Sequence, residues 1–440
     1  MKSRFTILVG LVLALALVAA ACSDDDDTGA EDTTTTAAEE TTTTAAETTT
    51  TAAETTTTAA ATDAIELVIW ADEKRAPVLE AAAPQVLEET GVALKIDQFD
   101  FDDLRTQVSQ AAPAGEGPDI FIGAHDWTGE FAANGIAAPI DLGGRESEWV
   151  DVSMVAFNYN GSLYSVPYAT EAIALYYNPD LVPEPPTTFA EMTAICDELG
   201  DAIDNCLGIP GGADDVGPAA YHHYPWVSVA GGYIFAFDLS TGYDTTDVGL
   251  DSEEAIAGVT ALQGLIEDGY IGNVTESDAE NQFKDGTSPF FLSGPWKIGG
   301  FDDEGITYGV TKIPTADGTP PAPFVGAQGF FINQFSDNTG VAQAFLLDYV
   351  ATEGVMTALY EADPRNPAYL ATFEAVAADN EIAKTFALSA ADGQPMPNIP
   401  EMGSVWEPLG NQMNGLRNGK TDAETAMTQA AQQVREAVGG

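Results

Sequence analysis

The sequence predicts an α/β fold with enough residues for two domains. Strand patterns alternate with helical patterns from residue 63 onward, which is typical of a sheet connected by right-handed crossovers. The chain has 440 residues, enough for two domains of about 150–200 residues each. Hydrophobic residues make up 45% of the chain, so it can bury a substantial core.

The elements of this alternation follow one another along the chain. Apolar runs predict strands, and apolar residues at helical spacing predict helices that end at glycine or before proline. We expect strands at 66–70, 92–99 and 118–122, and helices at 78–87 capped by Gly91, at 102–112 closing before Pro113 and Gly115, and at 127–134.

Three later helices are predicted in the same way. They cover 252–268 with Gly269 as the cap, 339–352, and 421–438. The last one opens with Thr421 and Glu424 at the spacing of a capping box, in which each side chain satisfies the other residue's backbone N–H.

The N-terminus has the pattern of an export signal. Lys2 and Arg4 precede an apolar run at 5–18, and three alanines then lead to Cys22. Such a run spans about 21 Å as a helix, short of the ~30 Å hydrocarbon core, so a permanent transmembrane helix is the weaker interpretation. A cysteine directly after small residues resembles a bacterial lipoprotein signal, and the alternative is an ordinary secretory signal with a chance cysteine.

We therefore expect residues 1–21 to be a signal peptide and Cys22 to carry the lipid. The chain would be anchored in the cell membrane on its extracytoplasmic face, because two acyl chains suffice for stable anchoring. Residues 22–62 are predicted to be a disordered tether, since 33–62 contain only Thr, Ala and Glu and no aromatic or large aliphatic side chain offsets the ordering entropy.

The charge balance excludes one large class of function. The chain has 69 acidic against 15 basic residues, a formal net charge of −54, so no basic stripe can bind nucleic acid by neutralising phosphates. Docking on an anionic membrane surface is disfavoured for the same reason. Ten acids lie in the tether and two bases in the leader, so the folded part itself is strongly acidic.

Two cysteines remain after Cys22. An exported chain enters an oxidising compartment, where Cys196 and Cys206 are expected to form a disulfide. The alternative is a pair of free thiols.

The motifs of common catalytic and cofactor sites are absent from the sequence. It has no phosphate-binding loop, no CxxC pair, no serine nucleophile elbow, and only His125, His222 and His223 as histidines. We expect no metal and no cofactor. Acidic residues are so abundant that a glycosidase-like pair of carboxylates could arise by chance.

Aromatic residues are spread through the folded part among polar ones. A sugar ring offers apolar C–H faces to aromatic rings and a rim of hydroxyls to carboxylates, amides and lysine. The alternative for any one of these aromatics is a place in the core. The tryptophans concerned are Trp70, Trp127, Trp226, Trp296 and Trp406.

Several short motifs follow one another in a fixed order between about residues 65 and 438. They are Gly117-Pro-Asp-Ile-Phe-Ile-Gly-Ala-His-Asp126, Asn160-Gly-Ser-Leu-Tyr-Ser-Val-Pro167 with Glu171, Gly231-Gly-Tyr-Ile-Phe235, Ser293-Gly-Pro-Trp296, and Pro395-Met-Pro-Asn-Ile-Pro-Glu-Met402 with Trp406. Each is weak alone, but their order and spacing together resemble maltose/maltodextrin-binding proteins, the solute-binding proteins of ABC sugar importers. Trp70-Ala-Asp-Glu-Lys74 resembles the Gram-positive lipoprotein branch.

The resemblance implies a two-lobed, Venus-flytrap α/β fold with the ligand in the cleft between the lobes. Lobe one would comprise 63–169 and 325–377, and lobe two 170–324 and 378–440. Such lobes close about a hinge, driven by contacts that the ligand makes better in the closed state.

The resemblance also implies a set of ligand-binding residues. Carboxylates and a lysine would bind sugar hydroxyls, and aromatic rings would stack on the sugar. These residues are Asp72, Glu73, Lys74, Asp126 and Glu171 for the hydroxyls, and Trp127, Tyr221, Trp296 and Trp406 for the stacking.

Four positions depart from the family pattern and leave the ligand's length and linkage open. Gly123 stands where the periplasmic branch has a stacking tryptophan, and Trp127 replaces the neighbouring arginine and could restore the platform from a shifted position. Ile298 replaces another aromatic, and Gly410 an arginine.

The leading hypothesis is a membrane-tethered, monomeric receptor that captures maltodextrin-type oligosaccharides. Permease subunits and a separate ATPase would be its partners. Alternatives are a receptor for another glycan such as trehalose, a cyclodextrin or another glucoside, an extracellular glycosidase, and a purely sensory binding protein.

Overall fold

The computed structural model describes residues 65–238, 242–316 and 318–439. The predicted signal peptide, Cys22 and the whole of the predicted tether, residues 22–62, lie outside these ranges. None of the helices in the described ranges is long and apolar enough to cross a membrane.

The first sheet is mixed, with its strands in the order β14-β6-β13-β3-β1-β2. β1 pairs in parallel with its neighbours β2 and β3, whereas β13 runs antiparallel to both β3 and β6. All nine residues of β13 are buried, because both faces of this strand are covered. The strands are β1 (Ile65–Ala71), β2 (Val92–Gln98), β3 (Ile120–Ala124), β6 (Ser165–Glu171), β13 (Phe324–Ile332) and β14 (Asn366–Pro367).

The second sheet has the strand order β12-β7-β11-β8. Two hairpins stand apart from both sheets, one formed by β4 and β5 and the other by β9 and β10. The strands are β7 (Ala174–Tyr177), β8 (Leu207–Gly208), β11 (Phe290–Ser293), β12 (Gly309–Thr311), β4 (Asn158–Tyr159), β5 (Ser162–Leu163), β9 (Phe235–Asp238) and β10 (Gly242–Val248).

Each sheet has a hydrophobic core of its own. The first core takes its buried residues from 67–169 and 327–368, and the larger core of the second sheet from 173–324 and 396–434. A third, smaller core gathers Tyr176, Phe283, Phe291 and Phe301 at the second sheet. The sequence alternation is thus confirmed as an α/β fold whose cores divide between two sheets, the arrangement expected of a two-lobed protein.

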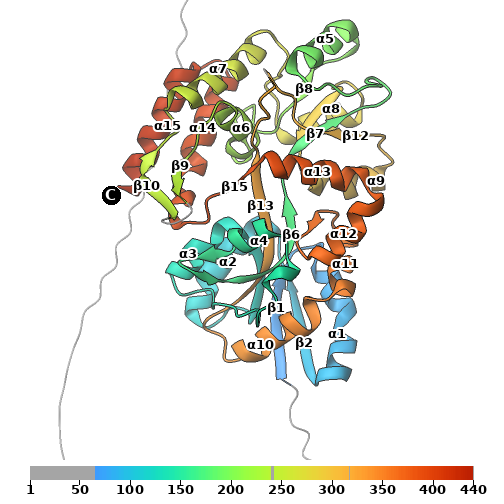
Figure 1. The fold of residues 1–440 in the computed structure, drawn as a ribbon, viewed down its shortest axis with the longest axis vertical. Coiled ribbons are helices and arrows are strands. Elements are labelled where there is room, and N and C mark those ends of the chain that lie inside the picture. The colour runs from blue at the N-terminus through green and yellow to red at the C-terminus, as the bar shows by residue number, and fades with distance from the viewer. Residues whose placement is uncertain (1–64, 239–241, 317, 440) are drawn as a thin grey trace, which may run out of the picture. The chain divides into compact units, whose positions relative to one another are not determined.

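The chain passes between the two sheets at three places. β6 ends at Glu171 and β7 begins at Ala174, so the first crossing lies at residues 172 and 173. β13 brings the chain back, since its first residue belongs to the second core and its last to the first. The third crossing lies between residue 368 of the first core and residue 396 of the second, and there β15 (Gln394–Pro395) pairs with the start of β13. β6 and β13 run side by side through the middle of the ribbon (Figure 1).

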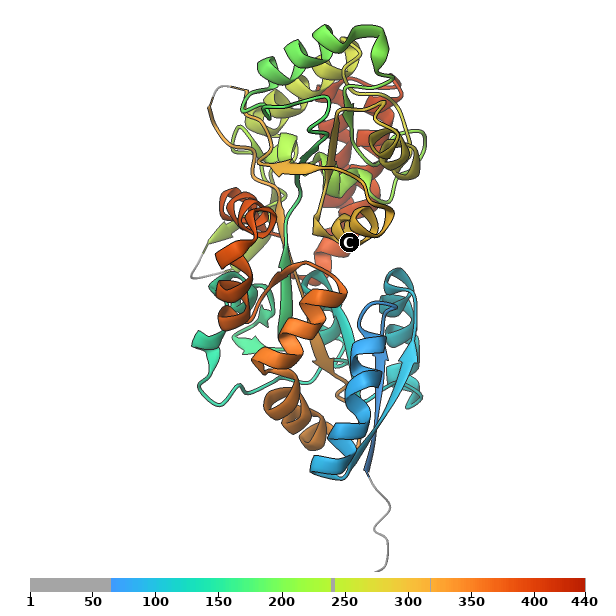
Figure 2. The ribbon, with the colours of Figure 1, turned by 90° about the vertical axis from the view of Figure 1, so that its right-hand side faces the viewer.

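Helices cover both sheets. In Figure 2 the segment with α11, α12 and α13 runs alongside β6, and contacts join α11 and α13 to that strand. The helices are α1 (Ala76–Thr90), α2 (Phe101–Ala114), α3 (Thr128–Ala133), α4 (Asp151–Ala156), α5 (Phe189–Leu199), α6 (Ala219–Ser228), α7 (Glu253–Glu267), α8 (Glu276–Lys284), α9 (Ile298–Glu304), α10 (Thr339–Phe345), α11 (Glu353–Ala362), α12 (Leu370–Asp379), α13 (Glu381–Asp392), α14 (Trp406–Arg417) and α15 (Ala423–Val438).

The predicted elements of the first 70 folded residues are confirmed, with one change at a helix end. α1 ends at Gly91, which adopts the left-handed conformation with φ 74°. α2 runs through Pro113 and ends instead at Gly115, also left-handed. The proline is exposed and only Ala114 follows it in the helix, so its missing N–H interrupts the hydrogen bonds of α2 only near the end.

The capping box predicted at Thr421 is wrong. α15 begins one residue later, and its N-cap is Asp422, whose carboxylate accepts the backbone N–H of Thr425 at 2.8 Å. A carboxylate at this place also interacts favourably with the positive end of the helix dipole. A complete capping box occurs at the start of α5 instead, between Thr188 and Glu191.

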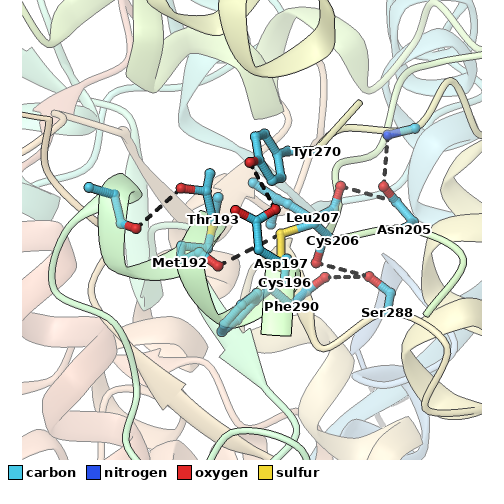
Figure 3. The surroundings of a disulfide bond; sticks show 12 residues. Met192, Thr193, Cys196, Asp197, Asn205, Cys206, Leu207, Tyr270, Ser288 and Phe290 are labelled. Carbon is cyan, nitrogen blue, oxygen red and sulfur yellow. Dashed lines mark hydrogen bonds between the residues drawn. A yellow bond between two sulfur atoms is a disulfide. The ribbon is translucent and has the colours of Figure 1, made fainter. Parts of the chain in front are cut away.

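Cys196 and Cys206 form a disulfide that joins the last turn of α5 to the segment before β8 (Figure 3). Both cysteines are buried in the second core. The surrounding loop is held by hydrogen bonds, among them one of 2.9 Å from the Ser288 hydroxyl to the Phe290 carbonyl.

Candidate functional site

Three of the predicted stacking residues meet around one buried phenylalanine. Tyr221 of α6 and Trp406 of α14 lie 5.8 and 6.0 Å from Phe324 between ring centroids, and Tyr221 lies 6.0 Å from Trp296. Phe324 itself is only 1% exposed, whereas the other three rings are partly exposed. We call Tyr221, Trp296, Phe324 and Trp406 the aromatic wall.

Trp296 is held in place by the turn that carries it. This short turn, η4 (Pro295–Lys297), follows β11, and the Trp296 ring lies against Gly294, where an added Cβ would come within 2.0 Å of the indole. The buried Tyr176 hydroxyl donates to the Gly294 carbonyl at 2.8 Å. Lys297 forms ion pairs of 2.6 and 3.0 Å with two acids of α8, so the turn is fixed from both sides.

Asp126 is a buried carboxylate that pairs with no other side chain of the described residues. It lies in the turn η1 (His125–Trp127) after β3, is 7% exposed, and receives no hydrogen bond or ion pair from the side chain of another described residue. Burial raises the pKa of this carboxyl, while His125 and Arg105 oppose the rise. The hydrogen bond that acts on this carboxylate comes from its own backbone N–H. A carboxylate can accept several hydrogen bonds, so Asp126 keeps acceptor capacity for a ligand that brings hydroxyl groups.

His125 positions that turn against the crossing segments. Its Nδ1 accepts the Ala327 N–H of β13 at 3.0 Å, and its Nε2 lies 3.0 Å from the Met396 carbonyl. These contacts require a neutral ring with the proton on Nε2. Burial lowers the pKa of His125, in agreement with a neutral ring. His125 therefore has a supporting role.

Glu171 lies at the end of β6, where the chain leaves the first sheet. Its carboxylate forms an ion pair with Arg365, and both side chains are nearly buried, at 13% and 14% exposure. The Glu171 side chain also lies over Gly326 of β13, where an added Cβ would come within 2.8 Å of Cγ and 3.0 Å of Oε1. The carboxylate is thus fixed between Arg365 and the backbone of β13 at Gly326, which has no side chain.

Residues from both lobes influence one another at this place. The Tyr221 hydroxyl is buried and has no hydrogen-bond partner among the described residues. Burial raises its pKa well above the ordinary value, the charges of Glu171 and Asp126 add to the rise, and Arg365 opposes it. Asp126, Glu171, Arg365 and the aromatic wall therefore share one neighbourhood.

The three predicted residues after β1 divide into two kinds. Asp72 is 1% exposed, and its Oδ1 accepts the backbone N–H groups of Lys74 and Arg75 at 2.9 and 3.1 Å and contacts the Arg75 guanidinium at 3.2 Å. This geometry favours a supporting role for Asp72. Glu73 and Lys74 are exposed, and Lys74 is near enough to lower the pKa of Asp363.

Trp127 is the predicted ligand-binding residue that the geometry supports least. Its ring lies beside Gly123, since a Cβ added to Gly123 would come within 2.5 Å of the indole. This is the place expected if Trp127 replaces the stacking tryptophan that Gly123 lacks. However, it packs 5.3 Å from Phe101 and 6.0 Å from Phe131 between ring centroids and is only 6% exposed. Trp127 is therefore chiefly a core residue in this structure.

Several residues of this neighbourhood were missed by sequence reasoning. Arg75, Asp363 and Arg365 join Asp72 to Glu171 in a chain of ion pairs, and Gln328 of β13 accepts from Arg75 at 3.0 Å. No local motif marks these positions. The available signal was the small number of arginines and lysines, because in a strongly acidic chain each of them is a candidate for a specific ion pair.

Among the residues in the described ranges, no cluster of three or more His, Cys, Asp or Glu side chains could hold a metal ion. The arrangement of Asp126, Glu171 and the aromatic wall offers hydroxyl acceptors beside aromatic surfaces. Its chemistry is recognition of a neutral, hydroxylated ligand with apolar faces.

One open hollow lies elsewhere, on the part of lobe one around β4 and β5. Its lining includes Ile140, Met154, Leu163 and Gln343, and none of the predicted ligand-binding residues. We place the candidate site at the aromatic wall and Asp126 rather than in this hollow, because only the former combines aromatic surface with a buried carboxylate.

A fold of two α/β lobes with such a site defines a class of binding proteins that hold small ligands. The family model described as bacterial extracellular solute-binding protein matches residues 81–390. The chain belongs to this family.

Characterised relatives cover most of the chain. It is 28% identical over 384 residues to the galactooligosaccharide-binding protein of Bacillus subtilis, covering 84% of this chain and 89% of the relative. It is 28% identical over 380 residues to a maltooligosaccharide ABC transporter solute-binding lipoprotein of Streptococcus pneumoniae, covering 85% and 89%. It is 29% identical over 316 residues to the maltotriose-binding protein of Pyrococcus abyssi, covering 69% and 66%.

Proposed function

We propose that this protein is the substrate-binding component of an ABC sugar importer and captures maltodextrin-type oligosaccharides. The observation that carries the proposal is the buried Asp126 carboxylate, which pairs with no other side chain in the described ranges, in the same neighbourhood as Tyr221 and Trp296. The carboxylate would accept hydroxyl hydrogens, and the rings would cover the apolar faces of the sugar. Glu171, Trp406 and the exposed Glu73 and Lys74 would complete the site.

The two lobes would close over the sugar. We assign lobe one to residues 63–169 and 325–377 and lobe two to 170–324 and 378–440. Asp126 belongs to the first lobe and the aromatic wall chiefly to the second, so a sugar that contacts both gains more in the closed state. This differential contact is what would drive hinge closure.

The relatives' names support an oligosaccharide ligand and leave its type open. Two of them name maltooligosaccharide or maltotriose and one names galactooligosaccharide. We favour a maltodextrin because the motifs that carry Asp126, Glu171, Trp296 and Trp406 resemble those of that branch. Another glycan such as trehalose, a cyclodextrin or a different glucoside is the alternative within the same class.

The proposed setting is the outer face of the cell membrane. Cys22 would carry the lipid and residues 22–62 would be the tether, in agreement with the lipoprotein named among the relatives. The receptor would act as a monomer and deliver sugar to permease subunits energised by a separate ATPase. It would need no metal or cofactor.

Incubation with maltotriose tests this proposal against the two remaining alternatives. We expect saturable binding by calorimetry and an unchanged sugar when the mixture is analysed by chromatography. Shortened products would identify a glycosidase. Gene neighbours that encode two permeases would favour import over a purely sensory role, and their absence would favour the sensor.

A further inference from the structure

Arg365 is the residue through which the first lobe reaches the aromatic wall of the second. It follows α11 and precedes β14, the edge strand that pairs with β6. Its side chain is 14% exposed although it is charged. Such burial is costly unless the charge is paired, so its partners show what holds it.

Two carboxylates hold the guanidinium. Arg365 forms an ion pair with Glu171 at the end of β6, and its Nε contacts Asp363 Oδ2 at 2.6 Å. The charges of these two acids raise the pKa of Arg365, so it is positively charged throughout. The interaction with Glu171 joins residues 194 apart in sequence.

The same guanidinium lies over a ring of the other lobe. Its central carbon is 5.6 Å from the centroid of Trp296, within the range of a cation–π interaction. The neighbouring Pro364 lies close to α9, with its Cδ 3.9 Å from the position of a Cβ on Gly299. The segment 363–365 therefore contacts the second lobe at η4 and lies near α9.

A second arginine fixes Asp363. Arg75, after β1, contacts Asp363 at 2.8 Å and Asp72 at 3.2 Å, and it lies 5.1 Å above the ring of Tyr168. This chain of three acids and two arginines leaves Arg365 little freedom to move within the first lobe. Glu171 lies just past the proposed lobe boundary but still on β6 of the first sheet. The contact of Arg365 with Trp296 is then the part of the network that can open with the hinge.

We propose that Arg365 is a positioning residue for sugar capture, which holds Glu171 and Trp296 in register across the two lobes before the ligand arrives. This inference rests on the proposed function. A contact that already draws the lobes together in the ligand-free protein lowers the free energy that the sugar must supply for closure. Because Arg365 is neutralised by two carboxylates, it serves a neutral sugar and does not attract an anionic ligand.

Scattering and calorimetry on Arg365 variants test the proposal. In Arg365→Gln the ion pair with Glu171 and the cation–π contact are lost. We expect a larger radius of gyration for the ligand-free protein by small-angle X-ray scattering and about 10- to 100-fold weaker binding of maltotriose, the range of one hydrogen bond to a charged group. Arg365→Lys keeps the positive charge and should restore part of both effects.

Arg145→Gln is a matched control. Arg145 also forms an ion pair, with Glu148, and lies 5.7 Å from the ring centroid of Trp149, but all these residues belong to the first lobe. We expect this variant to leave the radius of gyration and the sugar affinity unchanged. If Arg365→Gln does not fold, Trp296→Leu removes the cation–π contact from the other side, and the ligand-free protein should again expand.

The outcomes separate this proposal from the proposed function. An unchanged radius of gyration in Arg365→Gln and in Trp296→Leu would overturn the role of Arg365, whatever the ligand. Tighter sugar binding by Arg365→Gln would also overturn it, since Arg365 would then occupy the place of the sugar. If the wild-type protein binds no sugar, the proposed function fails, while the ligand-free scattering still tests Arg365.

Discussion

Adding one methyl group at Gly326 should disturb sugar binding through Glu171. Gly326 lies on β13 with an ordinary φ, so alanine brings no backbone strain there. Its Cβ would come within 2.8 Å of Glu171 Cγ and 3.0 Å of Oε1. Both distances are shorter than a normal contact, and the glutamate side chain must move because the strand backbone cannot.

The size of the effect follows from what the displaced carboxylate would lose. A hydrogen bond to a charged group contributes about 1.5–3 kcal/mol, so Gly326→Ala should weaken maltotriose binding by about 10- to 150-fold. The free energy of unfolding should fall by no more than about 1–3 kcal/mol, the usual cost of one extra methyl group in a packed region. The variant should therefore fold and bind poorly.

Calorimetric titration of purified Gly326→Ala with maltotriose measures the loss, and urea unfolding checks the fold. Gly340→Ala is the matched control, because Gly340 lies in α10 of the same lobe with no atom within 4 Å of its added Cβ. It should bind like the wild type. An affinity of Gly326→Ala equal to that of the control would refute the placing of Glu171 in the site.

Three further predictions concern the aromatic wall, the disulfide and the buried histidines. Trp296→Ala should weaken maltotriose binding by about 1–3 kcal/mol in calorimetry through lost stacking, and an unchanged affinity would remove Trp296 from the site. Replacing Cys196 and Cys206 by serine should lower the free energy of unfolding by about 2–3 kcal/mol, as chemical denaturation would measure, because the short closed loop is released; equal stability would contradict this. Burial lowers the pKa of His125, His222 and His223, so below pH 6.5 the unfolded chain binds protons that the native protein does not. The free energy of unfolding should then decrease as the pH is lowered, by at most about 1.4 kcal/mol per pH unit for each histidine. In urea unfolding between pH 7 and 5.5, His125→Gln should show a smaller decrease than the wild type.

Local signals predicted the elements and the contact-rich aromatics well. Gly91 ends α1 and Gly115 ends α2 because both adopt left-handed conformations, which sequence spacing can anticipate. Tyr221, Trp296 and Trp406 came from the resemblance to a family; Tyr221 and Trp406 both contact Phe324, and Trp296 contacts Tyr221. In these cases the residue type and its immediate neighbours in the sequence are enough to predict the helix end or the partly exposed ring.

Other features depended on contacts between distant segments and could not be predicted locally. Arg365 meets Glu171 across 194 positions, and the contact of Asp72 with Arg75 was not predicted. The role of Asp72 toward a ligand stays a prediction. At the start of α15, Thr421 and Asp422 are both good N-caps, and only the helix geometry selects the second. Sequence pattern names the residue types, whereas tertiary packing decides which of them remain unpartnered.

The most direct test of the account is a thermal-shift titration of the intact protein with maltose, maltotriose, longer maltooligosaccharides, trehalose, a cyclodextrin and a galactooligosaccharide. A ligand at 100 times its dissociation constant stabilises the native state by about 2.7 kcal/mol, which shifts the melting temperature measurably. We predict a saturable upward shift with at least one maltooligosaccharide and none with glycerol. The absence of a shift with every oligosaccharide would contradict the claim that this chain is a sugar receptor.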